Sequence, residues 1–114
     1  ISLHLPLNSE TLHLFNLDFI EKMEKQFYII NTSRGAILKT GDLINGLKNK
    51  KILGACLDVH EVETNTFNTI KINSEFNYLL NCENVILTPH IAGLSKESNQ
   101  KLSSVLIEKI LKIK

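Results

Sequence analysis

FYIINTSRGAILKTGDLINGL, residues 27–47, joins a strand pattern to a helix pattern through a short polar loop. Its first four residues form an apolar and aromatic run, as in a strand that is buried in a sheet. After the loop, Leu43, Ile44 and Leu47 recur at helical spacing. Arg34 stands between the two patterns, at a strand end, where α/β proteins bind their ligands. Arg34 is therefore either a cation in a ligand-binding position or a surface charge at a turn.

Strand patterns recur on both sides of this unit. Short apolar runs rich in β-branched or aromatic residues predict strands at residues 1–5, 27–31, 52–59 and 84–88. None of these runs alternates strictly between apolar and polar residues. This favours parallel strands in a sheet that is covered on both faces.

Helix patterns separate the four strands. We expect Asp18 and Thr40 to cap the first two helices, because their side-chain oxygens can accept hydrogen bonds from free helix N–H groups. Ser74 precedes a short third helix, and Ser95 opens a long terminal one. Strands and helices in strict alternation predict an α/β fold with about four parallel strands and crossover helices. Residues 61–73 form a long irregular stretch, which in a compact domain is usually functional or mobile.

Composition narrows the class of protein. The chain has 13 basic and 12 acidic side chains, a net charge of +1, which gives no basic surface for nucleic acid. Its apolar runs are shorter than the roughly 18 residues that indicate a membrane span. Cys56 and Cys82 lack the spacing of a zinc site or a disulfide framework, which favours a reducing, cytoplasmic compartment. Because the chain opens directly on a strand pattern, we expect a fragment of a larger protein.

Residues with chemical roles lie at or just beyond the end of each predicted strand. They are His4 and Pro6, then Thr32, Ser33 and Arg34, then Asp58, then Thr88, Pro89 and His90. Because parallel strands end at one edge of the sheet, these residues are expected to share a crevice. Taken singly, His4 could be structural and Asp58 a turn cap, but three unlike charged or titratable groups at three strand ends point to a site.

The chemistry of these groups is specific. A guanidinium binds a carboxylate with two hydrogen bonds and can polarise the adjacent carbonyl. A histidine can exchange a proton with an alcohol or ketone near neutral pH, and a nearby carboxylate favours its protonated form. Together they suit a 2-hydroxy or 2-oxo acid that exchanges a hydride with a nicotinamide. Yet the five glycines form no G-x-G-x-x-G turn for a pyrophosphate, so we expect the isolated chain to be inactive.

Three blocks of the sequence are similar to one known family. SLHLPLNSETLHLFN (2–16), INTSRGAILKTGDLINGLKNKKILGACLDVHEVE (30–63) and NVILTPHIAG (84–93) resemble the NAD-binding domain of the D-isomer-specific 2-hydroxyacid dehydrogenases. Members that resemble 3-phosphoglycerate dehydrogenase look most similar. The resemblance implies that residues 1–114 are the second half of a Rossmann-like, doubly wound parallel sheet in a two-domain enzyme. The first half, with its glycine-rich turn, and the substrate domain would lie outside this chain.

The resemblance also implies roles for individual residues. The catalytic set would be Arg34, Glu63 and His90. The cofactor would contact His4, Pro6, Thr32, Ser33, Arg34, Asp58, His90, Ile91, Ala92 and Gly93, and no metal is implied. Family members commonly have an aromatic residue at the position of His60 and a proline after the catalytic glutamate, where this chain has Thr64. Glu61 therefore stays an alternative, although the spacing from Asp58 favours Glu63.

The predicted function is that of an oxidoreductase, as part of the full-length protein. It would transfer a hydride between NAD(H), with NADP left open, and a small D-2-hydroxy or 2-oxo acid, with a 3-phosphoglycerate-like compound as one candidate. A homodimer is expected, without nucleic acid or membrane partners. The alternatives are a non-catalytic, NAD-sensing or corepressor-like binding module and an inactive truncated product.

Overall fold

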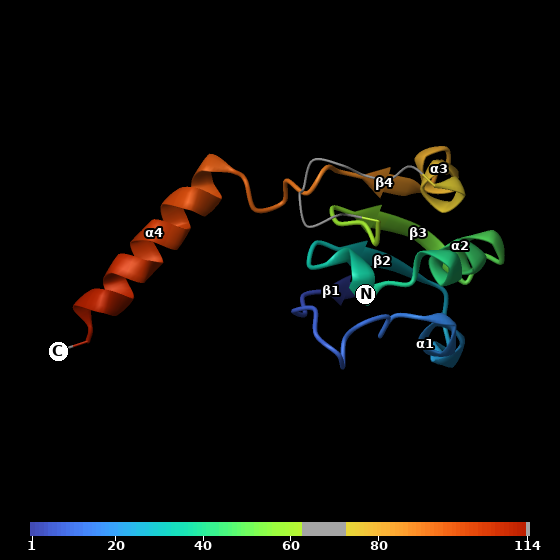
Figure 1. Ribbon diagram of the computed structural model, residues 1–114, viewed down its shortest axis with the longest axis horizontal. Coiled ribbons are helices and arrows are strands. Elements are labelled where there is room, and N and C mark those ends of the chain that lie inside the picture. Colours follow the sequence, from blue (N-terminus) through green and yellow to red (C-terminus); the bar gives the residue numbers. More distant parts are fainter. Residues whose placement is uncertain (63–72, 114) are drawn as a thin grey trace.

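The computed structural model describes residues 1–62 and 73–113. Strands and helices alternate along the chain, as predicted (Figure 1). The elements are β1 (Ser2–Leu3), α1 (Leu17–Lys22), β2 (Phe27–Asn31), the 3₁₀ turn η1 (Gly35–Ile37), α2 (Thr40–Lys48), β3 (Ile52–Leu57), α3 (Ser74–Leu80), β4 (Val85–Leu87) and α4 (Lys96–Leu111). The irregular stretch predicted at residues 61–73 lies mostly outside the described residues, and so does Glu63.

The described strands form one parallel sheet in the order β1-β2-β3-β4. Leu3 pairs with Asn31, Asn31 with Leu57, and Leu57 with Leu87, so the last residues of the four strands lie side by side. The predicted α/β fold with four parallel strands is confirmed. The first strand is shorter than residues 1–5, because its pairing with β2 ends at Leu3.

The core lies on one face of the sheet. Along β2, Phe27, Ile29 and Asn31 are buried while the residues between them are exposed. The buried strand residues form one apolar cluster with Ile20 of α1 and Leu43 of α2, and Leu79 of α3 belongs to the same cluster. Burying an apolar side chain of this size contributes about 1.5–3 kcal/mol, so this cluster is the main support of the sheet.

The other face of the sheet is open in the part of the chain that the structure describes. Tyr28, Ile30 and Ile86 are 63%, 42% and 63% exposed. The prediction that both faces are covered is therefore wrong for these residues. Apolar residues on both sides of a strand permit two covering layers, but α1, α2 and α3 of this chain all pack on one side.

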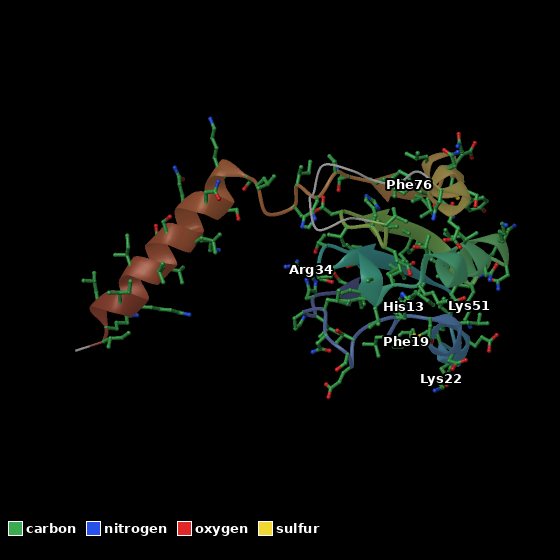
Figure 2. The ribbon with its side chains drawn as sticks, in the orientation of Figure 1. His13, Phe19, Lys22, Arg34, Lys51 and Phe76 are labelled. Atoms are coloured by element: carbon green, nitrogen blue, oxygen red, sulfur yellow. The ribbon has the colours of Figure 1, made fainter. Side chains whose placement is uncertain are left out.

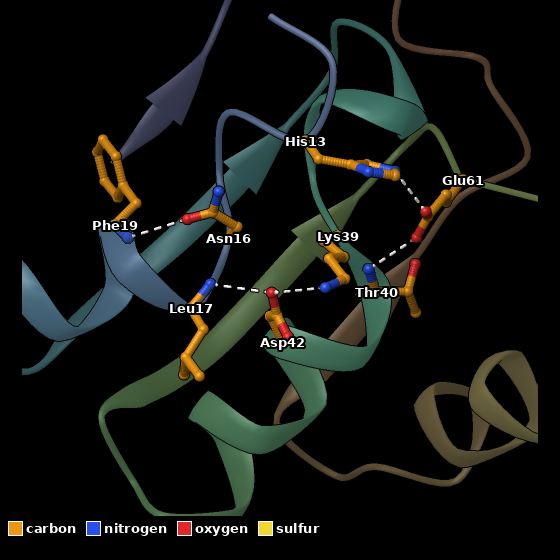
Figure 3. A network of polar contacts seen from close by, with 8 residues as sticks. All are labelled: His13, Asn16, Leu17, Phe19, Lys39, Thr40, Asp42 and Glu61. Atoms are coloured by element: carbon orange, nitrogen blue, oxygen red, sulfur yellow. Dashed lines mark hydrogen bonds and ion pairs between the residues drawn. The ribbon is translucent and has the colours of Figure 1, made fainter.

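Helix starts differ from the predictions at three places. Ser74 is the first residue of α3 rather than the residue before it, and Asn73 caps this helix through a 2.8 Å hydrogen bond from the Phe76 N–H. Asn16 caps α1 through a 3.1 Å hydrogen bond from the Phe19 N–H, so Asp18 lies inside the first turn and is not the cap. Thr40 is the first residue of α2 rather than its cap, and its N–H donates to Glu61 (Figure 3). A carboxylate from a distant loop thus replaces the local cap. Ser95 caps α4, as predicted.

Helix α4 extends away from the sheet, and the C-terminus lies at its far end (Figure 1). None of its residues is buried, although Leu102, Leu106 and Ile110 recur at helical spacing. Within the described ranges, neither α4 nor any shorter helix combines the length and the apolar character that crossing a bilayer requires.

Candidate functional site

Three loops meet at the carboxyl edge of the sheet, after β2, β3 and β4. They carry Arg34, Asp58 and His90. In Figure 2, Arg34 lies at the end of the sheet from which the chain leaves for α4. Strand register thus brings to one edge residues that are far apart in the sequence, as predicted.

The loop after β2 presents Arg34 to solvent. The side chain is exposed, and its Nη1 donates a 2.6 Å hydrogen bond to the carbonyl oxygen of Ser33. Gly35 follows, and a Cβ there would lie 2.0 Å from both the carbonyl carbon and the oxygen of His60. Only a residue without a side chain allows this contact, so Gly35 packs the Arg34 loop against the chain that leaves β3.

The loop after β4 is bound to β3 by the buried carboxylate of Asp58. Its Oδ1 accepts hydrogen bonds from the Thr88 hydroxyl and, at 3.0 Å, from the Ile91 N–H, while Oδ2 accepts one from the Ala92 N–H at 2.9 Å. His90 lies inside this bonded segment with a φ of 55°, in the left-handed region that non-glycine residues rarely adopt. Asp58 therefore holds the segment on both sides of His90, through the side chain of Thr88 before it and the backbone of Ile91 and Ala92 after it.

The charge of Asp58 follows from these bonds. Burial by itself raises the pKa of this carboxyl group, since it disfavours the charged form. The hydrogen bonds from Thr88, Ala92 and Ile91, together with the positive charge of His90, outweigh burial and hold the pKa of Asp58 below its ordinary value. Asp58 is thus ionised near neutral pH and provides a fixed negative charge beside His90.

His60 stands where the resemblance implies an aromatic residue. It is buried, and its ring meets the ring of Phe76 edge to face at a centroid distance of 5.1 Å. Its Nε2 lies 3.2 Å from the carbonyl oxygen of Thr88. The imidazole therefore packs as an aromatic ring would and also contacts the start of the His90 loop.

Glu61 makes contacts within the fold, to His13 and to the first residue of α2 (Figure 3). Its Oε1 lies 2.7 Å from Nε2 of His13, and its Oε2 accepts a 2.7 Å hydrogen bond from the Thr40 N–H. Both carboxylate oxygens thus link the loop after β3 to α2 and to the loop before α1. This engagement disfavours Glu61 as the acid partner of His90, and Glu63, outside the described residues, stays a prediction.

A hollow of about 340 Å³ opens beside Asp58 at the same edge. It is lined by Thr32, Cys56, Leu57, Asp58, Ile86, Thr88, Ile91 and Ala92. Four of the predicted cofactor contacts, Thr32, Asp58, Ile91 and Ala92, are among these residues.

The other predicted cofactor contacts do not line this hollow. His4 is exposed, and its Nε2 lies 2.7 Å from the hydroxyl oxygen of Ser2, two residues earlier in the chain. Pro6 and Gly93 are also exposed, while Ser33 is partly buried under the Arg34 loop.

Asn31 is a residue that the sequence reasoning missed. It ends β2 directly before the predicted contacts at Thr32 and Ser33, and its exposed fraction is 0%. The signal was present in the sequence, because Asn31 is a polar residue that closes an otherwise apolar strand run. Buried polar groups need hydrogen-bond partners, so such a residue marks a bonded network.

The fold and this edge define a class of protein. A parallel α/β sheet with a hollow at the carboxyl ends of its strands is the arrangement of a nucleotide-binding α/β protein. Residues 1–92 match the model of the "D-isomer specific 2-hydroxyacid dehydrogenase, NAD binding domain".

Individual relatives agree with this match. A glyoxylate reductase of Thermofilum pendens is 36% identical over 113 residues, which are 99% of this chain and 31% of that protein. A D-lactate dehydrogenase of Staphylococcus epidermidis is 36% identical over 107 residues, 90% of this chain and 32% of that protein. The NAD-complexed D-isomer specific 2-hydroxyacid dehydrogenase of Lactobacillus delbrueckii ssp. bulgaricus superposes with a TM-score of 0.79 at 31% identity, over 98% of this chain and 36% of that one.

The chain belongs to the D-isomer specific 2-hydroxyacid dehydrogenase family and lies in its NAD-binding domain. NAD is the cofactor of this domain, and solved relatives hold it, among them the Lactobacillus delbrueckii enzyme and a D-lactate dehydrogenase of Aquifex aeolicus that is complexed with NAD and lactic acid. The chain spans about a third of the length of the relatives it matches.

Proposed function

We propose that this chain forms the catalytic edge of an NAD-dependent dehydrogenase that interconverts a D-2-hydroxy acid and its 2-oxo acid. The observation that supports this most is the meeting of the Arg34, Asp58 and His90 loops at one sheet edge beside the hollow. The chain would be the second half of the NAD-binding domain. The glycine-rich turn and the substrate domain would be supplied by the rest of a longer protein, called here the complete protein.

The hollow beside Asp58 fits the nicotinamide end of the cofactor. Apolar side chains such as Leu57, Ile86 and Ile91 suit a flat ring, and the Asp58 carboxylate suits the N–H groups of a carboxamide. A carboxylate has about four acceptor positions, and the described residues give three donors to Asp58, which leaves one position among them for a ligand. Bound NADH would supply the hydride to the carbonyl carbon, and NAD would accept it in reverse.

Arg34 would bind the substrate. Its guanidinium carries five N–H donors in a rigid fork, and one nitrogen bonds to Ser33. The remaining donors can bind the carboxylate of the acid and polarise the adjacent carbonyl. This fixes the carbonyl carbon in one orientation at the edge.

His90 would exchange the proton. It would donate a proton to the carbonyl oxygen as the hydroxyl forms and take it back in the reverse reaction. Glu63 stays the predicted carboxylate partner of His90, and Asp58 provides a fixed negative charge beside it. Asp58 would in addition keep His90 in place through its bonds to Ile91 and Ala92.

The substrate class follows from the size of this constellation. One carboxylate-binding cation and one acid/base residue suffice for a small 2-oxo acid, and the names of the relatives include glyoxylate reductase and D-lactate dehydrogenase. A 3-phosphoglycerate-like substrate stays a prediction. The free thiols of Cys56 and Cys82 fit a cytoplasmic, reducing compartment. The complete protein is proposed to be a homodimer, which light scattering would detect.

Oxidation of NADH by the complete protein tests the proposal. Glyoxylate and pyruvate should be reduced, and D-lactate but not L-lactate should reduce NAD. Arg34→Ala and His90→Ala should each remove most of this turnover. NAD binding without turnover of any 2-oxo acid would instead favour the binding-module alternative.

A further inference from the structure

Asn31 connects the core of the sheet to Arg34 through its side-chain amide. It lies in β2 between β1 and β3, paired with Leu3 on one side and Leu57 on the other. Its side chain is fully buried at the point where the strand becomes the loop. Its position is therefore fixed by two neighbouring strands before the loop begins.

The amide of Asn31 holds two peptide groups of the loop, the one before Ser33 and the one after Arg34. Its Oδ1 accepts hydrogen bonds from the Ser33 N–H at 3.1 Å and from the Ser33 hydroxyl at 2.9 Å. Its Nδ2 donates to the carbonyl oxygen of Arg34 at 3.1 Å. The partners define the orientation of the amide, because a backbone N–H can only donate and a carbonyl oxygen can only accept.

The same network reaches the guanidinium. The Ser33 carbonyl oxygen accepts the 2.6 Å hydrogen bond from Nη1 of Arg34. Since Asn31 fixes the peptide groups on both sides of this carbonyl, it also fixes the direction from which the guanidinium is held. Gly35 then packs against His60, so the loop has little room to take another path.

We propose that Asn31 is a positioning residue for Arg34: its buried amide sets the loop conformation from which the guanidinium binds the substrate carboxylate. This inference rests on the proposed function of Arg34. It requires a side chain that both accepts and donates, which aspartate, leucine and serine cannot provide in the same geometry. A guanidinium displaced by about 1 Å would bind the acid less well.

The decisive variant is Asn31→Asp in the complete protein. Aspartate keeps the acceptor for Ser33 but loses the donor to the Arg34 carbonyl. We expect KM for the 2-oxo acid to rise about tenfold or more, with a smaller change in kcat. In an Arg34→Ala background the same substitution should change kcat/KM by less than about twofold, because Asn31 acts through Arg34. An undiminished effect in that background would overturn the proposal.

Two further variants make the experiment robust. Asn16→Asp is the matched control, since Asn16 caps α1 through its acceptor alone and aspartate keeps that bond. It should leave KM within about twofold of wild type. If Asn31→Asp does not fold, Ser33→Ala replaces it in the cycle. This variant loses only the hydroxyl bond to Asn31. It should therefore raise KM about twofold when Arg34 is present, and it should leave KM unchanged when Arg34 is already replaced by alanine.

Hydrogen exchange separates this inference from the proposed function. Amides 33–35 should exchange faster in Asn31→Asp than in wild type or Asn16→Asp. If the wild-type protein reduces no 2-oxo acid, the proposed function fails, and unchanged exchange in Asn31→Asp would then overturn the positioning of Arg34 as well. Faster exchange with an unchanged KM for an active enzyme would also overturn it.

Discussion

The loops that carry Arg34 and His90 lie at the same edge but are fixed in different ways. Asn31, from the strand that precedes the Arg34 loop, bonds to residues two and three positions further on. Asp58, directly after the neighbouring strand β3, bonds to the His90 loop across 30 to 34 residues of sequence. The first anchor is a neutral amide, while the second is a charged carboxylate.

This difference has physical consequences. The Arg34 loop depends on its own strand and on the contact between Gly35 and His60. The His90 loop depends on the pairing of β3 with β4 and on the ionisation of Asp58. Substitutions in the first loop should act on substrate binding, whereas those in the second should act on proton transfer and respond to pH.

The largest effect is expected at His90. His90→Ala in the complete protein removes the proton donor, and a positioned acid or base typically contributes about 10²- to 10⁴-fold to the rate. We expect kcat to fall by this factor while the affinity for NADH stays near that of wild type. Turnover close to wild type would show that another group donates the proton.

The next largest effect concerns two glycines, Gly35 and Gly93, which differ in the room that each has for a side chain. A Cβ at Gly35 would overlap backbone atoms of His60, whereas a Cβ at Gly93 would meet none of the described residues within 4 Å. Because overpacking typically costs about 1–3 kcal/mol and backbone atoms cannot rotate away, Gly35→Ala should lower the free energy of unfolding by at least this amount. Gly93→Ala should change it little. Chemical denaturation of both variants measures the difference, and equal stabilities would refute the close contact.

Arg34→Lys should separate binding from chemistry. Lysine keeps the positive charge but loses the rigid fork. Since a hydrogen bond to a charged group is worth about 1.5–3 kcal/mol, we expect KM for the 2-oxo acid to rise about 10- to 100-fold, with kcat less affected. Steady-state kinetics checks this, and full tolerance of lysine would mean that a simple charge is enough.

The smallest effect concerns the charged anchor. Asp58→Asn places an amide where the carboxylate accepts from Ile91 and Ala92, and leaving a buried donor unsatisfied costs about 1–3 kcal/mol. Asp42→Asn is the matched control, since Asp42 also accepts from a distant backbone N–H, that of Leu17, away from this edge (Figure 3). Thermal melting at neutral pH should show the larger loss for Asp58→Asn.

The pH dependence of this loss has a definite sign. Folding lowers the pKa of Asp58, so its stabilising contribution is fully present above the unfolded-state pKa of about 4 and is lost as pH falls through the lower folded-state pKa. The difference in unfolding free energy between wild type and Asp58→Asn should therefore shrink below about pH 4. A difference that stays constant with falling pH would contradict the charged anchor.

Local sequence patterns predicted most of the strands and helices. They could not predict hydrogen bonds between residues that are far apart in the sequence. The strand from Phe27 to Asn31 and the loop at Arg34 follow from a short stretch of sequence. The bonds of Asp58 to Ile91 and Ala92 could not be foreseen, because nothing local relates residues so far apart.

The helix starts and the open sheet face also show what local sequence patterns cannot decide. Asn16 and Asp18 are equally good caps by type, and only the observed first turn decides between them. Likewise, apolar Tyr28 and Ile30 allow a covering layer on their face without saying which segment provides it.

One measurement tests the central claim most directly: NADH binding and NADH oxidation, followed together in the complete protein with glyoxylate or pyruvate, for wild type and His90→Ala. If the edge formed by Arg34, Asp58 and His90 is the catalytic site, wild type will bind NADH and form the D-2-hydroxy acid where the product is chiral. His90→Ala will bind NADH equally well but turn over at least about 100-fold more slowly. Equal turnover by both proteins, or none by wild type, would contradict this account.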